Sequence, residues 1–432
     1  MKRKKLTALI TLFCFLCGCG ETVGTTYDIS RAIPKIENST NLSETTAAVT
    51  DAPTTEPNIE KTIPEEIDLS IDNEIEVYDK ITIEDIISDD RIELENGSEL
   101  LDTNEIGEKK FKVKYLYNDK NYENEISYTV VDTTPPVLLN SGGNAVALAG
   151  TEFDLNNYVG FADNYDSAPT LTYEGYIDTN VCGVYPLTAT AADSSGNFTT
   201  WDLSIEVAYE TPYPEDNNDR IPFENFIAQY SSDNTRFGID ISEWQGNVDF
   251  EALKNAGCSF VIIRMGHYYD DAQMDEYYFN NIEAAKAAGL EVGVYIYTTA
   301  NSEEEIKENA KWISDTLGGQ ELDFPVVFDW EEFGNFQQYN MSIHDLNSYF
   351  LMFAKEMGSY GYSSMLYSSK NFLNNFWYEQ TEYPVWLAHF TDETDYDGDY
   401  VMWQASCYGR INGIDADVDF NILYTDELNK FK

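Results

Sequence analysis

The stretch FPVVFDWE at residues 324–331 is an apolar run of strand length that ends in two acidic residues, Asp329 and Glu331. Such a run is typical of a buried parallel strand that carries charged groups to the mouth of a barrel, where the functional residues of these folds gather. Alternate residues of a strand point to the same face, so both carboxylates would enter one cavity and Trp330 would point the other way. The stretch therefore predicts a barrel strand with an acidic end.

Two further acidic residues end short apolar runs, Asp240 in FGIDIS and Asp419 in DVDFN. The first and last strands of a closed barrel are neighbours, so Asp240 and Asp419 would flank the same groove. Facing carboxylates are the groups that hydrolyse glycosidic bonds. The four acids are therefore candidate catalytic residues. The structural alternative is that they are solvated strand ends, or ion-paired with Arg264 and lysines.

Residues 236–425 alternate between strand patterns and helix patterns. Helix starts are indicated after Asp275 and at the capping signatures of Ser302 and Ser342. Five strand-helix units are followed by three strands with only loops between them, which predicts an α/β, TIM-like barrel of the irregular form (β/α)5(β)3. The expected strands are 237–242, 260–266, 291–298, 324–331, 364–369, 384–390, 400–406 and 417–421.

The N-terminus has the features of an export signal, with a basic start and an apolar stretch, Leu6 to Leu16, too short to span a membrane as a mature helix. The following Leu-Cys-Gly-Cys resembles the bacterial lipobox, which implies a signal peptide at 1–18 and lipidation of Cys19. An ordinary signal peptide with incidental cysteines is the alternative. Residues 19–65 are rich in Thr, Ser, Glu, Pro and Asn and predict a disordered tether.

Residues 66–208 carry short alternating strands separated by turns, which predicts an all-β region of two β-sandwiches, 66–133 and 134–208. The strand patterns that begin at Gly107 and Gly183 form a weak repeat. Both copies are assigned as immunoglobulin-like (Ig-like) modules: the second resembles those of bacterial surface proteins, and the first matches that pattern less well. For both, this implies a spacer role or, alternatively, binding of wall or sugar. A linker at 209–235 is expected between these modules and the barrel.

The chain has 432 residues and a net charge of −51, from 77 acidic and 26 basic residues. The length fits two to four domains, and the charge argues against nucleic acid as a partner. The excess of acid favours a solubility role, and calcium binding by some acidic loops is the alternative. No D-x-D-x-D-G run is present, so spacing names no calcium site. The three histidines have no metal-ligand spacing, so we expect no metal site and no cofactor; they are His267, His344 and His389.

Three cysteines follow the signal segment besides Cys19: Cys182, Cys258 and Cys407. A bridge between Cys258 and Cys407 is compatible with export, but Cys258 stands where an apolar strand-start residue would serve. We therefore expect buried free thiols.

Seven short motifs occur in a fixed order in the C-terminal half: GIDIS-x-WQG (238–246), FVIIR (260–264), AAGL-x-VGVY (287–295), PVV-x-D-x-E (325–331), YSS (367–369), WQ (403–404) and VD-x-N (418–421). Together they resemble glycoside hydrolase family 25, the lysozymes that cleave the β-1,4 bond after N-acetylmuramic acid in peptidoglycan. No single motif would suffice, and the resemblance rests on their order over about 190 residues.

The resemblance implies that Glu331 is the general acid, with a pKa raised by the neighbouring charges of Asp329, Asp240 and Asp419. Asp329 would orient the 2-acetamido group of the substrate, act as a nucleophile or activate water, and the sequence leaves these routes open. Residues matched as substrate-binding, each with a core role as the alternative, are Tyr295, Tyr297, Tyr367, Trp386, Trp403, Gln404, Gln245 and Arg264.

The resemblance therefore implies a monomeric surface lysozyme that acts on the glycan strands of peptidoglycan and is anchored to the outer face of the cell membrane through Cys19. One alternative is a catalytically weak or inactive wall-binding module. The other is a hydrolase of the N-acetylglucosaminidase or chitinase kind.

Overall fold

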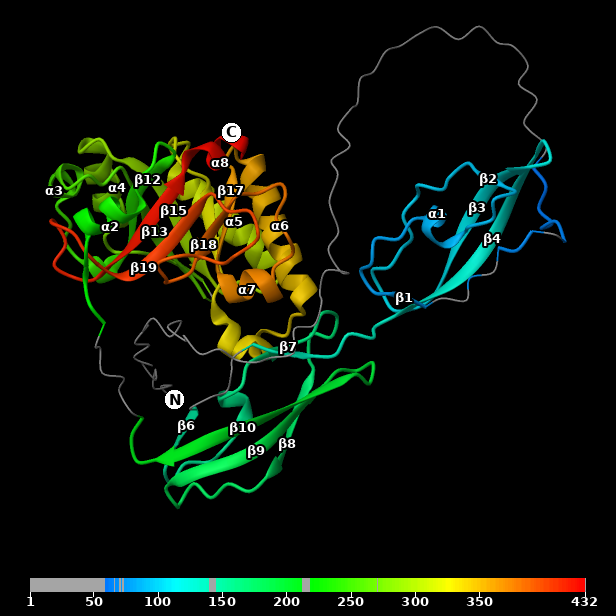
Figure 1. Cartoon of the computed structure of the whole chain (residues 1–432), viewed down its shortest axis with the longest axis horizontal. Coiled ribbons are helices and arrows are strands. Elements are labelled where there is room, and N and C mark those ends of the chain that lie inside the picture. Colours follow the sequence, from blue (N-terminus) through cyan, green and yellow to red (C-terminus); the bar gives the residue numbers. More distant parts are fainter. Residues whose placement is uncertain are drawn as a thin grey trace, which may run out of the picture.

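A computed structural model of the chain describes residues 59–431, except 66, 70, 72–73, 140–144, 212–217 and 270. The predicted signal peptide, Cys19 and the tether as far as residue 58 lie outside the described residues. Within them, no helix is both long and apolar enough to cross a membrane. Two β-rich modules precede the barrel along the chain (Figure 1).

The C-terminal part is a closed barrel of eight strands. Its strands are β12 (Thr235–Ile241), β13 (Phe260–Tyr268), β15 (Glu291–Thr298), β16 (Val326–Asp329), β17 (Ser364–Ser369), β18 (Val385–Ala388), β19 (Met402–Arg410) and β20 (Val418–Tyr424). The strands from β12 to β19 run parallel in chain order, and β20 closes the barrel by pairing antiparallel with both β19 and β12. A short strand, β14 (Ala272–Met274), pairs antiparallel with the C-terminal end of β13.

Helices follow the first five barrel strands and are absent between the last three, as the sequence predicts. They are α3 (Phe250–Asn255), α4 (Tyr278–Ala287), α5 (Glu303–Leu317), α6 (Ile343–Ser359) and α7 (Lys370–Asn375). Ser302 and Ser342 cap α5 and α6 by accepting hydrogen bonds from the backbone N–H groups of Glu305 and Asp345. Short 3-10 helices, η3 (Glu243–Gln245) and η4 (Glu332–Tyr339), follow β12 and β16, and α8 (Thr425–Leu428) and η5 (Asn429–Phe431) end the chain.

The segment expected as a linker at 209–235 contains ordered structure that belongs to the barrel. It forms β11 (Ile221–Pro222), which pairs with β19, and α2 (Phe223–Tyr230). The rings of Phe223 and Phe226 lie 4.8 and 5.0 Å from that of Phe420 on β20. These apolar side chains give α2 a buried face, and the barrel unit therefore begins before residue 236.

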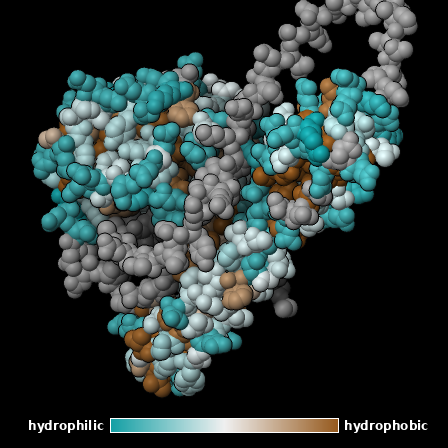
Figure 2. Space-filling view, turned by 45° about the vertical axis from the view of Figure 1, so that its right-hand side comes forward, coloured by the Kyte–Doolittle hydropathy of each residue, from teal (hydrophilic) through white to brown (hydrophobic). Residues whose placement is uncertain are grey.

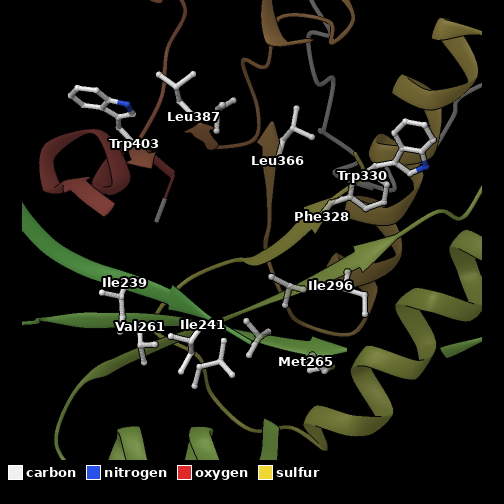
Figure 3. Packing of buried hydrophobic residues seen from close by; sticks show 14 of the residues in the cluster. Ile239, Ile241, Val261, Met265, Ile296, Phe328, Trp330, Leu366, Leu387 and Trp403 are labelled. Carbon is white, nitrogen blue, oxygen red and sulfur yellow. The ribbon is translucent and has the colours of Figure 1, made fainter. Parts of the chain in front are cut away.

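Side chains on alternate positions of the barrel strands separate into two apolar clusters. The larger one lies between strands and helices and includes Ile239, Val261 and Ile296, which Figure 3 shows together. The smaller one lies on the opposite faces of the strands and includes Ile262 and Met365. The alternation leaves the inward positions at the strand ends free for polar residues.

The first β module forms one sheet rather than the expected sandwich. Its strands β1 (Glu74–Glu76), β4 (Lys120–Val131), β3 (Gly107–Tyr117) and β2 (Glu93–Leu94) lie in that order, and α1 (Ile83–Ile86) supplies Ile83 to the core on one face. The β3–β4 hairpin also carries ion pairs of Lys110 with Glu125 and of Lys112 with Glu123. Such charged pairs do not suit the packing of a second sheet.

The second β module repeats the strand order of the first. Its four-stranded sheet runs β6 (Ala145–Leu148), β10 (Phe198–Ala208), β9 (Gly183–Ala192) and β8 (Thr170–Gly175), and the outer strand β6 is parallel to β10 as β1 is to β4. A two-stranded ribbon of β5 (Val137–Leu138) and β7 (Phe161–Ala162) and a 3-10 turn, η2 (Leu155–Asn157), complete it. The shared order agrees with the repeat seen in the sequence.

The second module contacts the barrel through the segment between η2 and β8. The side-chain amide of Gln337 in η4 donates to the carbonyl oxygens of Asn156 and Val159 at 3.0 and 3.1 Å. The backbone N–H of Ile343, at the start of α6, donates to the carbonyl of Asp163 at 2.8 Å. Because η4 directly follows Glu331, these hydrogen bonds hold the second module against the segment that follows β16.

Of the three cysteines that the structure describes, Cys258 and Cys407 are buried and Cys182 is exposed, and no disulfide joins them. The expectation of buried thiols in place of a bridge between Cys258 and Cys407 is confirmed. In the view of Figure 2 the barrel surface is largely hydrophilic, which agrees with the net charge of −51.

Gly160 provides a test of the contact between module and barrel. A Cβ at this position would lie 2.4 Å from the carbonyl oxygen of Phe333, a backbone atom of η4 that cannot swing away. We expect Gly160→Ala to lower the free energy of unfolding by about 1–3 kcal/mol, measured by urea or thermal unfolding.

The matched control for this experiment is Gly358→Ala within α6, where a Cβ would meet nothing within 4 Å. Alanine there should be neutral or add about 0.4–1 kcal/mol, because it restricts the unfolded chain. Equal unfolding curves for Gly160→Ala and the wild type would contradict the described contact.

Candidate active site

The closure of the barrel places Asp240 beside Asp419, as the sequence predicts. The two residues are direct partners in the antiparallel pairing of β12 with β20. One oxygen of Asp240, Oδ2, accepts hydrogen bonds from the side-chain amides of Gln404 at 3.0 Å and Asn421 at 2.7 Å. The carboxyl of Asp240 is 7% exposed, so these two bonds replace the water it loses.

Asp329 is the last residue of β16, so Glu331, which was expected on the same strand, lies just beyond it as the N-cap residue of η4. Asp329 lies between two tyrosines on the neighbouring strands. Tyr297 of β15 and Tyr367 of β17 are its partners in the parallel pairings. Asp329 is 5% exposed and its Oδ1 accepts no hydrogen bond, whereas Trp330 is fully buried on the opposite side against Phe333. The predicted opposite orientations of Asp329 and Trp330 are therefore confirmed.

Burial and mutual proximity raise the pKa values of the inward acids. Burial is the main cause for Glu331, whose pKa rises to about 7, and the charges of Glu332 and Asp240 raise it further. Burial and the charge of Glu331 hold the pKa of Asp329 well above its usual range, and burial also raises that of Asp240. At neutral pH the pair of Asp329 and Glu331 therefore retains a shared proton.

The cause of the raised pKa differs in part from the sequence expectation. For Glu331, burial outweighs the neighbouring charges, and Asp329 and Tyr367 act in the opposite direction as hydrogen-bond partners that lower the pKa. The acidic cluster is thus a desolvated, hydrogen-bonded network as well as a set of like charges.

Several of the predicted substrate-binding residues belong to this network. The hydroxyl of Tyr367 donates to Gln404 at 2.8 Å, and Gln404 in turn donates to Asp240. The indole N–H of Trp386 donates to Asn421 at 2.8 Å. The network also reaches Tyr295, whose pKa burial holds well above its usual range and whose surroundings include Arg264 and three of the four acids.

Tyr297 lies beside the acids, where its hydroxyl donates to Glu332 at 2.7 Å. Arg264 is 6% exposed and forms ion pairs with Asp275 at 3.0 Å and Glu243 at 2.8 Å. Its charge lowers the pKa of Asp329. Arg264 thus supplies positive charge close to the acids, while its ion pairs are with Glu243 and Asp275.

The structure does not bring Trp403 and Gln245 into the network. Trp403 is 3% exposed in the layer between strands and helices, where its ring lies 5.6 Å from that of Tyr230 (Figure 3). Gln245 accepts from the backbone of Ser242 and donates to the carbonyl of Asp417. Trp403 thus has a core role and Gln245 a local capping role.

Four residues close to the site are not among the sequence candidates. Asn421 forms hydrogen bonds with both Asp240 and Trp386. It is the last residue of the VD-x-N motif, and this motif could have identified it as a site residue. Tyr269 lies 5.9 Å from the ring of Tyr297, and Glu332 accepts the hydrogen bond of Tyr297. A fourth, Trp244 in η3, has 58% of its surface exposed just after the strand that carries Asp240. An exposed indole close to the acids offers a flat surface on which a ligand ring could stack.

The comparisons with known proteins point to the same part of the chain. Residues 239–414 match the model of the Glycosyl hydrolases family 25. The barrel is a glycoside hydrolase family 25 domain. The match begins within β12 and includes the strands from β13 to β19, whereas β20, which carries Asp419 and Asn421, follows just after it.

Curated relatives of this domain carry lysozyme names. The "Autolytic lysozyme" of Clostridium acetobutylicum is 31% identical over 188 residues, 43% of this chain and 54% of the relative. "Lysozyme M1" of Streptomyces globisporus is 28% identical over 199 residues, 43% of this chain and 66% of the relative. The chain thus spans about half the length of the autolytic lysozyme.

Among solved structures, a bacterial lysozyme from Streptomyces coelicolor aligns with a TM-score of 0.41 and 23% identity, over 46% of this chain and all of that chain.

The raised pKa of Glu331 predicts a pH-dependent stability difference between the wild type and Glu331→Gln. Between its ordinary value of 4.5 and about 7, the folded protein holds a proton that the unfolded chain releases. The stabilising effect of this proton is fully present below the lower pH and is lost as the pH rises through about 7. Glutamine has no such proton to lose.

We therefore expect Glu331→Gln to be more stable than the wild type by roughly 1–3 kcal/mol at about pH 8, with the difference shrinking below about pH 4.5. Urea unfolding at the two pH values measures it. A stability difference that does not change with pH would contradict a raised pKa at Glu331.

Proposed function

We propose that the protein is a cell-surface peptidoglycan hydrolase, a lysozyme that cleaves the β-1,4 bond between N-acetylmuramic acid and N-acetylglucosamine. The observation that carries the proposal is the pair of Asp329 and Glu331, which retains a proton near neutral pH inside a family 25 domain. The lysozyme names of the two relatives described above support it.

In this proposal Glu331 is the general acid. A pKa of about 7 keeps a large fraction of its carboxyl protonated at neutral pH, while the proton remains acidic enough to transfer. Glu331 donates this proton to the glycosidic oxygen as the bond to the anomeric carbon breaks. The resulting carboxylate then takes a proton from the water that attacks the anomeric carbon, which restores the starting state.

Asp329 acts as a partner to the N-acetyl group of the substrate. When the proton shared by the pair is on Glu331, Asp329 is a carboxylate that can balance a positive charge beside it, so we favour substrate assistance. The acetamido oxygen attacks the anomeric carbon and forms a ring intermediate, while the Asp329 carboxyl hydrogen-bonds the acetamido nitrogen and offsets its developing positive charge. Water then opens the ring with retention of configuration.

Asp240 has a positioning role in this scheme. It is bound by Gln404 and Asn421 and raises the pKa of Glu331 through its charge. Gln404 also accepts the hydrogen bond of Tyr367, which is itself a hydrogen-bond partner of Glu331. One chain of hydrogen bonds therefore fixes the acids relative to each other before substrate binds.

The location and the remaining segments complete the proposal. Cys19 would carry a lipid that holds the protein on the outer face of the membrane, and the tether as far as residue 58 and the two β modules would space the barrel from it. Glu60, which was expected in the tether, instead pairs with Tyr122 of the first module. The net charge of −51 disfavours anionic partners, so sugar contacts would supply the affinity for the wall. The proposal also includes the assignment of the second module as an Ig-like module.

The activity test uses purified peptidoglycan and mass spectrometry of the released fragments. We expect fragments that end in reducing N-acetylmuramic acid, and Glu331→Gln should lower the rate by a factor of about 10² or more. The matched control is Glu304→Gln, an exposed glutamate at the start of α5, which should retain full activity.

Fragments that end in reducing N-acetylglucosamine would reject the muramidase in favour of a glucosaminidase. Wall binding without release of fragments would instead identify an inactive wall-binding module. An active Glu331→Gln variant would remove Glu331 from the general-acid role.

A further inference from the structure

Three aspartates from separate segments meet at the second β module. Asp132 follows β4, Asp163 follows β7 and Asp193 follows β9. One carboxylate oxygen from each lies within 4.8 Å of the other two. Asp163 and Asp193 follow Asp132 by 31 and 61 positions in the sequence, yet the three carboxylates lie close together. All three are far in sequence from the proposed catalytic acids.

One carboxylate oxygen in this cluster, Asp163 Oδ2, is buried without a hydrogen-bond donor. Asp163 is 1% exposed, and its Oδ1 accepts from the backbone N–H groups of Tyr165 and Asp166 at 2.9 and 2.7 Å. Its Oδ2 is buried and accepts none, and the Oδ1 atom of the adjacent Asn164 is in the same state. A buried oxygen that accepts no hydrogen bond lowers the stability of the folded state unless a ligand binds it.

The other two carboxylates are held in place by their own loops. Asp193 Oδ1 accepts from the backbone of Gly196 and Asn197 at 2.7 and 2.8 Å. Asp132 Oδ2 accepts from the hydroxyl of Ser195 at 2.9 Å, and the amide of Asn197 donates to the Asp132 carbonyl at 3.0 Å. The loop after β9 thus fixes both acids in a preorganised arrangement.

Neighbouring groups do not neutralise the cluster. In the part of the chain that the structure describes, no lysine or arginine forms an ion pair with any of the three aspartates. Burial raises the pKa of Asp163 to about 7, and the charges of Asp132 and Asp193 raise it further. Burial likewise raises the pKa of Asp132. A bound cation would remove this repulsion.

We propose that Asp132, Asp163 and Asp193 bind a calcium ion. The donors are all oxygen atoms, the ligands that hard cations prefer. Calcium lies about 2.3–2.6 Å from its ligands, so oxygens on opposite sides of the ion are about 4.6–5.2 Å apart, and a mutual limit of 4.8 Å fits such a shell. Magnesium needs a tighter octahedron at about 2.0–2.1 Å and gives up its water reluctantly.

The site lies where the modules meet the barrel. The carbonyl groups of Asp163 and Asn164 accept from the backbone N–H groups of Ile343 and His344 at the start of α6. The His344 ring stacks on Tyr78 of the first module with centroids 3.5 Å apart. A cation that fixes the loop at Asp163 therefore also stabilises the link between both modules and the barrel. The sequence expectation of no metal site is at odds with this proposal, because it considered histidines and local spacing alone.

The experiment uses the purified full chain stripped with a chelator and titrated with calcium chloride by calorimetry and thermal unfolding. We expect binding with a dissociation constant of about 10⁻³ M or tighter and a rise in the melting temperature by several degrees at saturation. Magnesium at the same concentration should produce a clearly smaller shift. Asp163→Asn should abolish the calcium shift.

Asp163→Asn is informative because it should fold without calcium. Its amide removes one negative charge from the cluster, so its melting temperature in chelator should equal or exceed that of the wild type. The matched control is Asp178→Asn in the same module, which caps Asn180 away from the cluster and should keep the full calcium shift. The proposal is overturned if calcium leaves the wild-type melting temperature unchanged, if magnesium acts equally well, or if Asp163→Asn keeps the shift.

Discussion

The antiparallel pairing of β20 with both β12 and β19 is the constraint on which the rest of the barrel depends. Parallel strands alone would leave β12 and β19 as open edges, and β20 supplies the hydrogen bonds that join them. The register of this strand sets Asp240 opposite Asp419 and brings Asn421 to Asp240. The strand that closes the barrel therefore also completes the network around the candidate catalytic acids.

Burying several carboxylates in one network is unfavourable unless protons and hydrogen bonds offset the charge. Amide donors from Gln404 and Asn421 satisfy Asp240, and a retained proton reduces the charge of the pair of Asp329 and Glu331. The same proton is what general acid catalysis requires. In this account the fold becomes less stable at alkaline pH, because Glu331 then loses its proton while it remains buried. The raised pKa that suits Glu331 to general acid catalysis is also what causes this loss of stability.

Local patterns in the sequence were sufficient for the barrel because buried parallel strands and capped helices leave clear signals. The runs that end in Asp240 and Asp329 and the caps at Ser302 and Ser342 all occur where they were expected. The prediction of Trp403 as a substrate-binding residue was at odds with the strand geometry, since consecutive residues face opposite ways and Gln404 takes the inward position.

Contacts between distant segments could not be predicted in this way. The single sheet of the first module depends on Ile83 of α1, whose helix of four residues is too short for a clear periodic signal. The fit of Gly160 against η4 and the meeting of Asp132, Asp163 and Asp193 depend on how separate loops pack. The spacing of these residues along the chain does not indicate that they come into contact.

A carboxyl titration by carbon-13 NMR tests the central claim most directly, because it observes the proton on Glu331 itself. The account predicts that Glu331 titrates near pH 7 in the wild type, as an apparent value shared with Asp329. In Asp240→Asn, where one neighbouring negative charge is gone, Glu331 should titrate at a lower pH. A midpoint near the ordinary value of 4.5 in the wild type, or no change in Asp240→Asn, would contradict it.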